Sequence, residues 1–238
     1  MAAKANPIPS VWARKQPEPE QPALSRAAIV REAVAMLDES GIDELSMRKL
    51  GARLNAGATS LYRHVATKDE LMELAVDEVF GEIRVPAVGG GWRSAVAELA
   101  GSFRATALRH PWLVSVLGQA GLAYLGPQLM TVTEALASLF SGAGFADPRG
   151  ALDTVVAYVI GVSTTEAAWL STVARSGQTE PEFVARLLPA AQRAAADHEH
   201  LSGQAADAAA ENPAEVREAK FRYGLDVVLD GLALRLSS

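Results

Sequence analysis

The 238-residue sequence contains no cysteine, and this absence excludes disulfide frameworks, thiolate zinc sites and thiol catalysis. It also lacks an apolar run of about seven or more residues near the N-terminus, so a secretory signal is not expected. Hydrophobic residues make up 49% and charged residues 21% of the chain, which excludes wholesale disorder. These features predict a globular, cytoplasmic protein.

Only one long stretch of the sequence is free of formal charge. It runs from Pro111 to Thr133 and is long enough to be weighed as a membrane span. However, Gln119, Pro127 and Gln128 divide it into shorter pieces, together with three glycines. We therefore expect buried core helices here and no partnership with a membrane.

Charge is unevenly distributed along the chain, whose formal net charge is −6. Residues 1–68 carry ten basic and seven acidic side chains, whereas residues 69–238 carry twelve and twenty-one. Between Ser46 and Lys68 there are five basic residues and no acidic one. A short basic island in an acidic protein predicts a local anionic partner.

Composition divides the chain into three parts. Residues 1–24 hold five of the twelve prolines and are expected to form a disordered arm. Residues 25–84 and 92–238 are rich in alanine and leucine, with apolar residues three to four positions apart, which predicts two all-α domains. Pro86 and three consecutive glycines mark the joint between them.

The second domain is expected to contain six helices. A β-branched run, Thr154–Val162, leaves a strand open at one place, but its proline-free surroundings favour a long buried helix. The expected helices are Trp92–Arg109, Pro111–Tyr124, Pro127–Gly142, Arg149–Arg175, Glu180–Ala196 and Ala214–Leu236.

The first domain contains four short helical segments with capping signals. We expect helices over Ser25–Ser40, Ser46–Asn55, Thr59–Val65 and Lys68–Ile83. The turn after the second helix contains Gly57, which we expect to supply a positive φ angle. Thr67 and Glu70 form a capping box before the fourth helix.

A second and a third helix joined by a short turn with glycine are typical of the helix-turn-helix, whose second helix enters the major groove of DNA. The side chains between Thr59 and His64 suit contacts to bases and phosphates, while Leu61 and Val65 point inward. The alternative is an ordinary three-helix unit with a solvated basic face.

The motif Leu61-Tyr62-x-His64-Val65, followed by Lys68-x-x-Leu71, resembles the DNA-binding domain of the tetracycline-repressor (TetR) family. The segment Ser46-Met47-Arg48-Lys49-Leu50 is similar to the start of that family's second helix. Asn55 departs from the more usual glycine, although asparagine also tolerates left-handed geometry. The resemblance implies DNA contacts at Ser46, Arg48, Ala58, Thr59, Ser60, Tyr62, Arg63, His64 and Lys68.

The C-terminal helix carries an apolar stripe with two small residues beside it. Such a face serves the core or a subunit contact, and the sequence alone does not choose between them. The family resemblance implies a homodimer built on a four-helix bundle, in which this helix takes part. The interface is then expected at Phe221, Gly224, Leu225, Val228, Gly231 and Leu232.

The segment around Ser102 and the C-terminal helix are similar to the tetracycline-repressor branch of the family. That branch implies recognition of a magnesium–tetracycline chelate, but Leu117, Val162 and Leu170 stand where polar or ligating groups are needed. We therefore expect a largely apolar organic inducer and no metal. Pocket residues are expected among the aromatic and polar side chains of the middle helices, namely Phe103, Trp112, Tyr124, Met130, Tyr158, Thr164, Thr165, Glu166 and Trp169.

No motif points to catalysis or to a cofactor. Gly161-x-Ser163 lacks the later glycine of a nucleophile elbow, and residues 89–91 are not followed by the residues of a phosphate loop. His198 and His200 are spaced poorly for a metal. The sequence predicts a ligand-responsive repressor of a palindromic operator. Two alternatives remain. One is an all-α enzyme or ligand-binding protein with an incidental basic turn, and the other is a DNA binder without sequence preference.

Overall fold

A computed structural model describes residues 24–86, 91–117, 126–198 and 212–236. These residues contain helices and no strand, which confirms the predicted all-α class. The N-terminal domain consists of α1 (Arg26–Ser40), the 3₁₀ turn η2 (Ile42–Glu44), α2 (Met47–Arg53), α3 (Ala58–Leu61) and α4 (Lys68–Phe80). The C-terminal domain consists of α5 (Trp92–Arg109), α6 (Pro111–Leu117), α7 (Pro127–Gly142), α8 (Pro148–Ser176), α9 (Glu180–Ala195) and α11 (Pro213–Leu236).

The helices of the N-terminal domain begin where the sequence supplies a cap. Ser25, Ser46 and Thr67 each accept a hydrogen bond from a backbone N–H in the first turn of the helix that follows. The apolar face of α1, including Ile29 and Leu37, packs on α4 and α2. Local capping and apolar spacing therefore account for this domain.

The turn between α2 and α3 differs from the expected one. Asn55 has the positive φ angle, +50°, whereas Gly57 has φ −69° and ψ 144°. Gly51 is the glycine that the turn requires, because a Cβ atom there would lie 2.6 Å from the carbonyl oxygen of Ala56. The prediction for Gly57 was therefore wrong. Glycine is required at Gly51 instead, because the backbone of α2 approaches the backbone of the turn closely there.

Helix α3 is shorter than the sequence suggests. It ends at Leu61, and Tyr62 is its C-terminal cap, so the expected helix to Val65 is wrong. The N–H groups of His64 and Val65 both donate to the carbonyl oxygen of Leu61, which tightens the chain into a turn. Leu61 and Val65 are both buried, as the pattern predicted.

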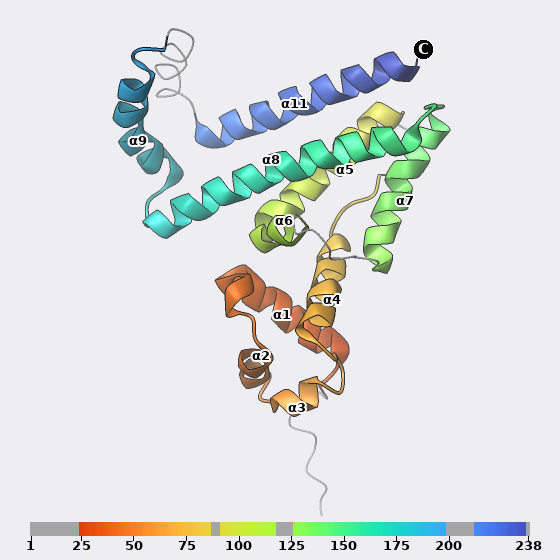
Figure 1. The fold of residues 1–238 in the computed structure, drawn as a ribbon, viewed down its shortest axis with the longest axis vertical. Helices are drawn as coiled ribbons and strands as arrows, with labels where there is room; N and C mark the ends of the chain where they lie inside the picture. Colours follow the sequence, from red (N-terminus) through yellow and green to blue (C-terminus); the bar gives the residue numbers. More distant parts are fainter. Residues whose placement is uncertain (1–23, 87–90, 118–125, 199–211, 237–238) are drawn as a thin grey trace, which may run out of the picture.

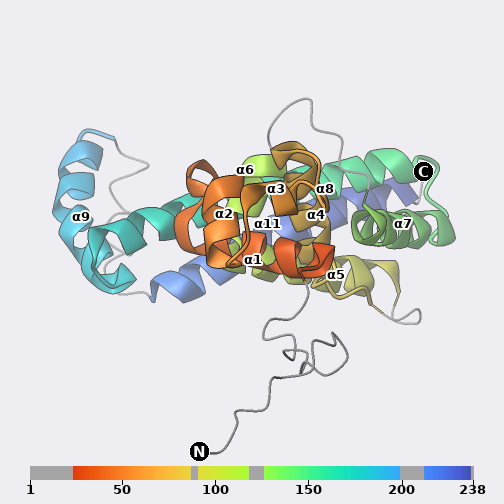
Figure 2. The same ribbon diagram turned by 90° about the horizontal axis from the view of Figure 1, so that it is seen from below.

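In the C-terminal domain, α8 and α11 lie side by side and run in opposite directions (Figure 1). The β-branched run Thr154–Val162 lies within α8, so the strand alternative is excluded. Val155 and Val159 are buried along one face of α8, against α5 and α7. Helix α9 follows α8 at the end away from α7 (Figures 1 and 2).

The two domains share one continuous apolar core. They meet where Phe80 of α4 packs edge-on against Phe103 of α5, with ring centroids 6.0 Å apart. Contacts also join α4 to α7 and α1 to α6. Within the part of the chain that the structure describes, no helix is long and apolar enough to cross a membrane.

Candidate DNA-binding surface and ligand cavity

The short helix α3 lies at the tip of the N-terminal domain, away from the C-terminal domain (Figure 1). Leu61 and Val65 anchor it in the core, being 0% and 1% exposed. Tyr62 is 51% exposed, and Arg63 and His64 beside it are also exposed. This segment therefore presents a phenol, a guanidinium and an imidazole to solvent on one small surface.

The five cations of the basic island are not equally available. Arg53 is bound to Glu32 and Glu39, and Lys49 is bound to Glu44. The hydrogen bond from Arg53 lowers the pKa of Glu39, and the one from Lys49 lowers the pKa of Glu44. Two of the five positive charges are thus neutralised within the domain.

The remaining three cations are Arg48, Arg63 and Lys68. Arg48 and Arg63 form no ion pair with any described residue, and Lys68 donates only a long bond of 3.4 Å to the carbonyl oxygen of Ile42. Arg48 lies in α2, Arg63 follows α3, and Lys68 begins α4. Free cations on three successive elements are suited to binding phosphate groups.

The other expected DNA contacts lie on the same segments. Thr59 is exposed, and Ala58 and Ser60 are half-buried along α3. Ser46 caps α2 by accepting from the N–H of Lys49 at 3.3 Å, which leaves its hydroxyl proton free to donate. The structure therefore brings all nine expected residues to one end of the molecule.

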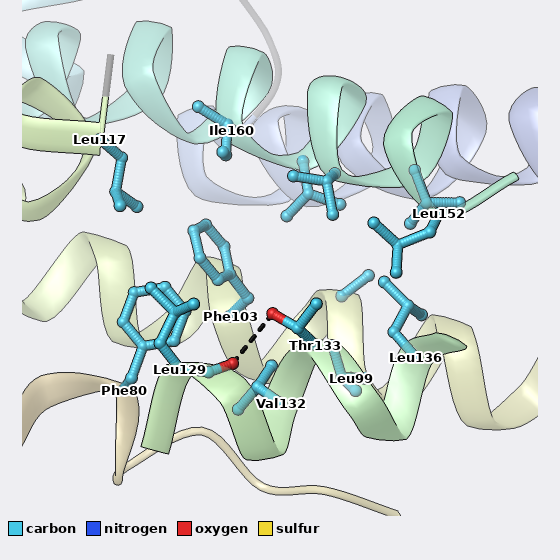
Figure 3. A pocket seen from close by; sticks show the side chains of 14 residues that line it. Phe80, Leu99, Phe103, Leu117, Leu129, Val132, Thr133, Leu136, Leu152 and Ile160 are labelled. Carbon is cyan, nitrogen blue, oxygen red and sulfur yellow. Dashed lines mark hydrogen bonds between the residues drawn. The ribbon is translucent and has the colours of Figure 1, made fainter. Parts of the chain in front are cut away.

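A cavity of about 180 Å³ lies where the two domains meet, between α4 of the N-terminal domain and α5, α6, α7 and α8 of the C-terminal domain (Figure 3). Among its described lining residues, Thr133 alone has a polar side chain, and its hydroxyl donates to the carbonyl oxygen of Leu129 at 2.9 Å. The described part of the wall therefore provides van der Waals contact and no free polar side-chain group. Its lining residues are Phe80, Leu99, Ala100, Phe103, Leu117, Leu129, Val132, Thr133, Leu136, Leu152, Val155, Val156, Val159 and Ile160.

Eight of the nine residues expected to line a ligand pocket are described by the structure, and of these eight it places Phe103 alone on this cavity. Trp112 is buried, but its indole N–H donates to Asp38 of α1. Met130 lies on an exposed face of α7, and the hydroxyl of Tyr158 donates to the carbonyl oxygen of Phe221. Tyr124 lies outside the described residues.

The other four expected residues lie further along α8. Thr164 and Thr165 donate to carbonyl oxygens of the preceding turn, and the indole of Trp169 donates to Glu180 at 2.6 Å. Thr165, Glu166 and Trp169 line a separate hollow of about 300 Å³ between α8 and α11. Sequence reasoning selected aromatic and polar side chains, whereas most residues that wall the cavity are aliphatic, and their spacing is that of any core helix.

Glu166 is the centre of a buried ion-pair cluster. It is 7% exposed and binds Arg104 at 2.7 and 2.8 Å and Arg217 at 2.9 Å. Burial opposes its ionisation, but the bonds from the two arginines outweigh burial and lower the pKa of Glu166. The cluster joins α5, α8 and α11, so Glu166 serves packing in this structure.

The C-terminal helix places its predicted interface residues in two different surroundings. Phe221 and Leu225 are each 4% exposed and belong to the protomer's own core, so the expectation that they face another chain is wrong. Gly224, Val228 and Leu232 are half-buried, and Gly231 is exposed. The apolar residues that α11 exposes are Val216, Tyr223, Val227 and Leu234.

Comparison with protein families assigns both domains. Residues 29–75 match the family described as bacterial regulatory proteins of the tetR family, and residues 85–236 match the tetracyclin repressor-like C-terminal domain. The chain belongs to the TetR family. A TetR-family chain is a transcriptional regulator, and both the predicted family and the predicted fold class are confirmed.

Relatives of this TetR-family chain are named regulators and repressors. An HTH-type transcriptional regulator of Saccharopolyspora erythraea is 40% identical over 164 residues, covering 67% of this chain and 69% of its own. The repressor DrrR1 of Streptomyces coeruleorubidus is 32% identical over 89% of this chain and 78% of its own. The class A tetracycline repressor from Escherichia coli is 32% identical over 89% of this chain and 92% of its own.

A similar TetR-family structure has been solved with a bound small molecule. It is ActR of Streptomyces coelicolor in complex with actinorhodin, which has a TM-score of 0.73 and 27% identity and covers 89% of this chain and 96% of its own. The crystal structure of BioQ with its double-stranded DNA operator shares the fold, at 22% identity and a TM-score of 0.62.

Proposed function

We propose that this TetR-family chain is a homodimeric repressor that binds a palindromic operator and is released by a small, largely apolar organic molecule without a metal. The observation that carries this proposal is the position of Phe80. It is the last residue of α4 in the DNA-binding domain, and its ring also lines the apolar cavity (Figure 3). A ligand in the cavity would thus touch the domain that binds DNA.

The DNA half of the proposal rests on the surface around α3. Tyr62, Arg63 and His64 are exposed, and Arg48 and Lys68 flank them with positive charge. In a helix-turn-helix, residues of the second helix read bases while flanking cations hold phosphates. We assign base reading to Thr59, Ser60 and Tyr62–His64, with Ala58 as a close contact, and phosphate binding to Ser46, Arg48 and Lys68.

The inducer half rests on the chemistry of the cavity walls. A hard cation needs oxygen ligands, and the described walls provide only one hydroxyl, which is already bonded. An engineered cavity of about 150 Å³ lined by leucine, isoleucine and phenylalanine takes up benzene. The cavity in this chain suits an apolar molecule of about that size.

The homodimer is supported by the exposed side of α11. Val216, Tyr223, Val227 and Leu234 recur seven, four and seven residues apart, which places them on one face, the face that α8 does not cover. Tyr223 is 76% exposed, and a large aromatic side chain is an effective anchor when a partner covers it. Tyr223→Asp combined with Val227→Asp is expected to convert the dimer into monomers in sedimentation velocity.

The test of the proposed function has two stages. Duplexes that bind the full chain are selected from a random pool, and we expect enrichment of a palindrome whose half-sites are about 34–36 Å apart. Apolar compounds, each paired with a charged analogue of similar size, are then screened for release of the selected duplex, with and without EDTA.

Release by the apolar member alone, unchanged by EDTA, supports the proposal. Enrichment of no sequence would contradict the operator, and release by charged analogues or only with divalent metal would contradict the apolar cavity. Turnover of a compound without any selected duplex would favour the enzyme alternative.

A further inference from the structure

Helix α7 has an N-terminal cap that comes from the other domain. The first N–H groups of a helix have no partner within it, and most helices take one from their own N-cap side chain. The N-cap residue of α7 is Gly126, which has no side chain. Instead, Oδ1 of Asp77, in α4, accepts from the N–H of Gln128 at 2.9 Å and of Leu129 at 3.1 Å.

The geometry around this cap is tight. A Cβ atom on Gly126 would lie 2.1 Å from Oδ1 of Asp77, so a residue other than glycine would displace the carboxylate. The side chain of Gln128 also approaches the end of α4, because a Cβ on Gly81 would meet it at 3.5 Å. A carboxylate at a helix N-terminus is stabilised further by the helix dipole. The two helices are therefore attached at one defined point.

Leu129 belongs both to this attachment and to the wall of the cavity. Its backbone N–H donates to Asp77, and its side chain lines the cavity (Figure 3). Val132 and Leu136 follow on the same helix and line the cavity too. A displacement of α7 by a molecule in the cavity is thus passed directly to Asp77.

Asp77 lies on a helix that is packed firmly into the DNA-binding domain. Its neighbours Ala75 and Val76 are fully buried, and α4 contacts α1 along this face. Helix α4 begins three residues after Val65, the last residue of the recognition segment, by which we mean Thr59–Val65. A movement of α4 therefore moves the surface that carries Tyr62 and Arg63.

We propose that Asp77 is a positioning residue that couples the cavity wall formed by α7 to the orientation of the DNA-binding domain. This inference rests on the proposed function, because it concerns how the cavity and the operator site influence each other. Linkage requires the coupling to act in both directions, so binding of DNA alters α7 as much as a ligand on α7 alters DNA binding. The coupling is therefore measurable from the DNA side, before any inducer is known.

The experiment measures backbone hydrogen exchange in α7 of the full chain, alone and saturated with the selected duplex. Peptides covering residues 130–136 are followed, because Asp77 bonds none of their N–H groups directly. Three variants are compared with the natural chain, namely Asp77→Ala, Asp77→Asn and Glu78→Ala. Asparagine keeps the acceptor oxygen, and Glu78 is an exposed acidic neighbour with no bond to α7 among the described residues.

In the natural chain we expect the duplex to slow exchange in this segment by about 5- to 150-fold, the range of typical coupling between sites. Asp77→Ala should still bind the duplex but should reduce the change to about twofold or less, whereas Asp77→Asn and Glu78→Ala should keep most of it. If the cap only stabilised α7, its loss in Asp77→Ala would raise exchange equally with and without DNA. The ratio of the exchange rates with and without DNA would then be the same as in the natural chain.

Three outcomes would overturn the inference. The duplex could leave α7 unchanged in the natural chain, Asp77→Ala could respond as the natural chain does, or Asp77→Asn could lose the response together with alanine. A response that survives in Asp77→Ala would assign the coupling to the other contacts between the domains, such as Phe80 with Phe103 and His110 with Asp38. Failure to bind any duplex is seen before exchange is measured, and it would count against the proposed function itself.

Discussion

Nδ1 of His110, at the end of α5, lies 2.7 Å from Oδ1 of Asp38 in α1, and this contact joins the two domains. The same carboxylate oxygen accepts from the indole N–H of Trp112 at 2.8 Å. The other ring nitrogen of His110 lies 3.2 Å from Glu82, which follows α4. His110 is 8% exposed, so a largely buried imidazole contacts two carboxylates of the DNA-binding domain.

Asp38→Ala is expected to lower the free energy of unfolding by about 2 kcal/mol, because a hydrogen bond to a charged group contributes about 1.5–3 kcal/mol and two buried donors lose their acceptor. Urea-induced unfolding of the full chain measures the change. Asp43→Ala is the matched control, since Asp43 is an exposed carboxylate near the same end of α1. Equal unfolding midpoints for the two variants would remove the stabilising role of this contact.

Arg63→Ala is expected to weaken binding to the selected duplex by about 1–3 kcal/mol, because Arg63 is a free cation beside the recognition helix. Fluorescence anisotropy at fixed salt measures the affinity. Arg149→Ala removes the same charge from the start of α8, where the side chain is 91% exposed, and it should leave the affinity unchanged. If both variants lose the same affinity, the effect is one of net charge, and Arg63 does not contact the operator.

Glu166→Gln is expected to destabilise the fold by about 1–3 kcal/mol at pH 7, because Arg104 and Arg217 would each lose one of two carboxylate partners and keep only Glu218 and Glu180 respectively. The folded-state pKa of Glu166 lies below that of the unfolded chain. Its ion pairs therefore stabilise fully above the ordinary glutamate value of about 4.3, and this stabilisation is lost as the pH falls through the folded-state pKa.

Urea unfolding of the Glu166→Gln variant and the natural chain should accordingly converge as the pH is lowered below about 4. Glu98→Gln, at an exposed position of α5, is the control and should follow the natural chain at every pH. A difference that stays constant with pH would show that the ion pairs are not the origin of the effect.

Two glycine substitutions are expected to act in opposite directions. Gly51→Ala places a Cβ 2.6 Å from the carbonyl oxygen of Ala56, so it should destabilise the DNA-binding domain by about 1–3 kcal/mol. Gly101→Ala lies inside α5 with no atom within 4 Å of the added Cβ, and it should stabilise by about 0.5–1 kcal/mol. Thermal unfolding compares the two, and a stabilising Gly51→Ala would contradict the observed turn.

The recognition segment shows how far sequence reasoning reaches. In the recognition segment and the residues around it, from Ser46 to Lys68, helix caps, buried apolar residues and exposed side chains follow one another within a few turns. The structural role of each can therefore be predicted from its position in the sequence. The sequence does not show that Arg53 is neutralised, because its partners Glu32 and Glu39 lie on a different helix. Of the five cations, contacts within the domain pair two and leave Arg48, Arg63 and Lys68 without an ion pair to any described residue.

The cavity and the C-terminal helix were less predictable for a related reason. Leu129, Val132 and Leu136 have the spacing of any buried helix face, and a cavity arises only where such faces fail to fill the space between them. Phe221 and Leu225 form an apolar stripe that suits either a core or a second chain, and the position of α8 assigned it to the core.

Local signals in the sequence determined the helices, their caps, the family motif and the anionic nature of the partner, because each depends on residues a few positions apart. Tertiary structure decided which cations remain free, where the cavity lies and how α7 is capped. Each of these depends on two helices meeting, and Asp77 acquires its role from residues about fifty positions away.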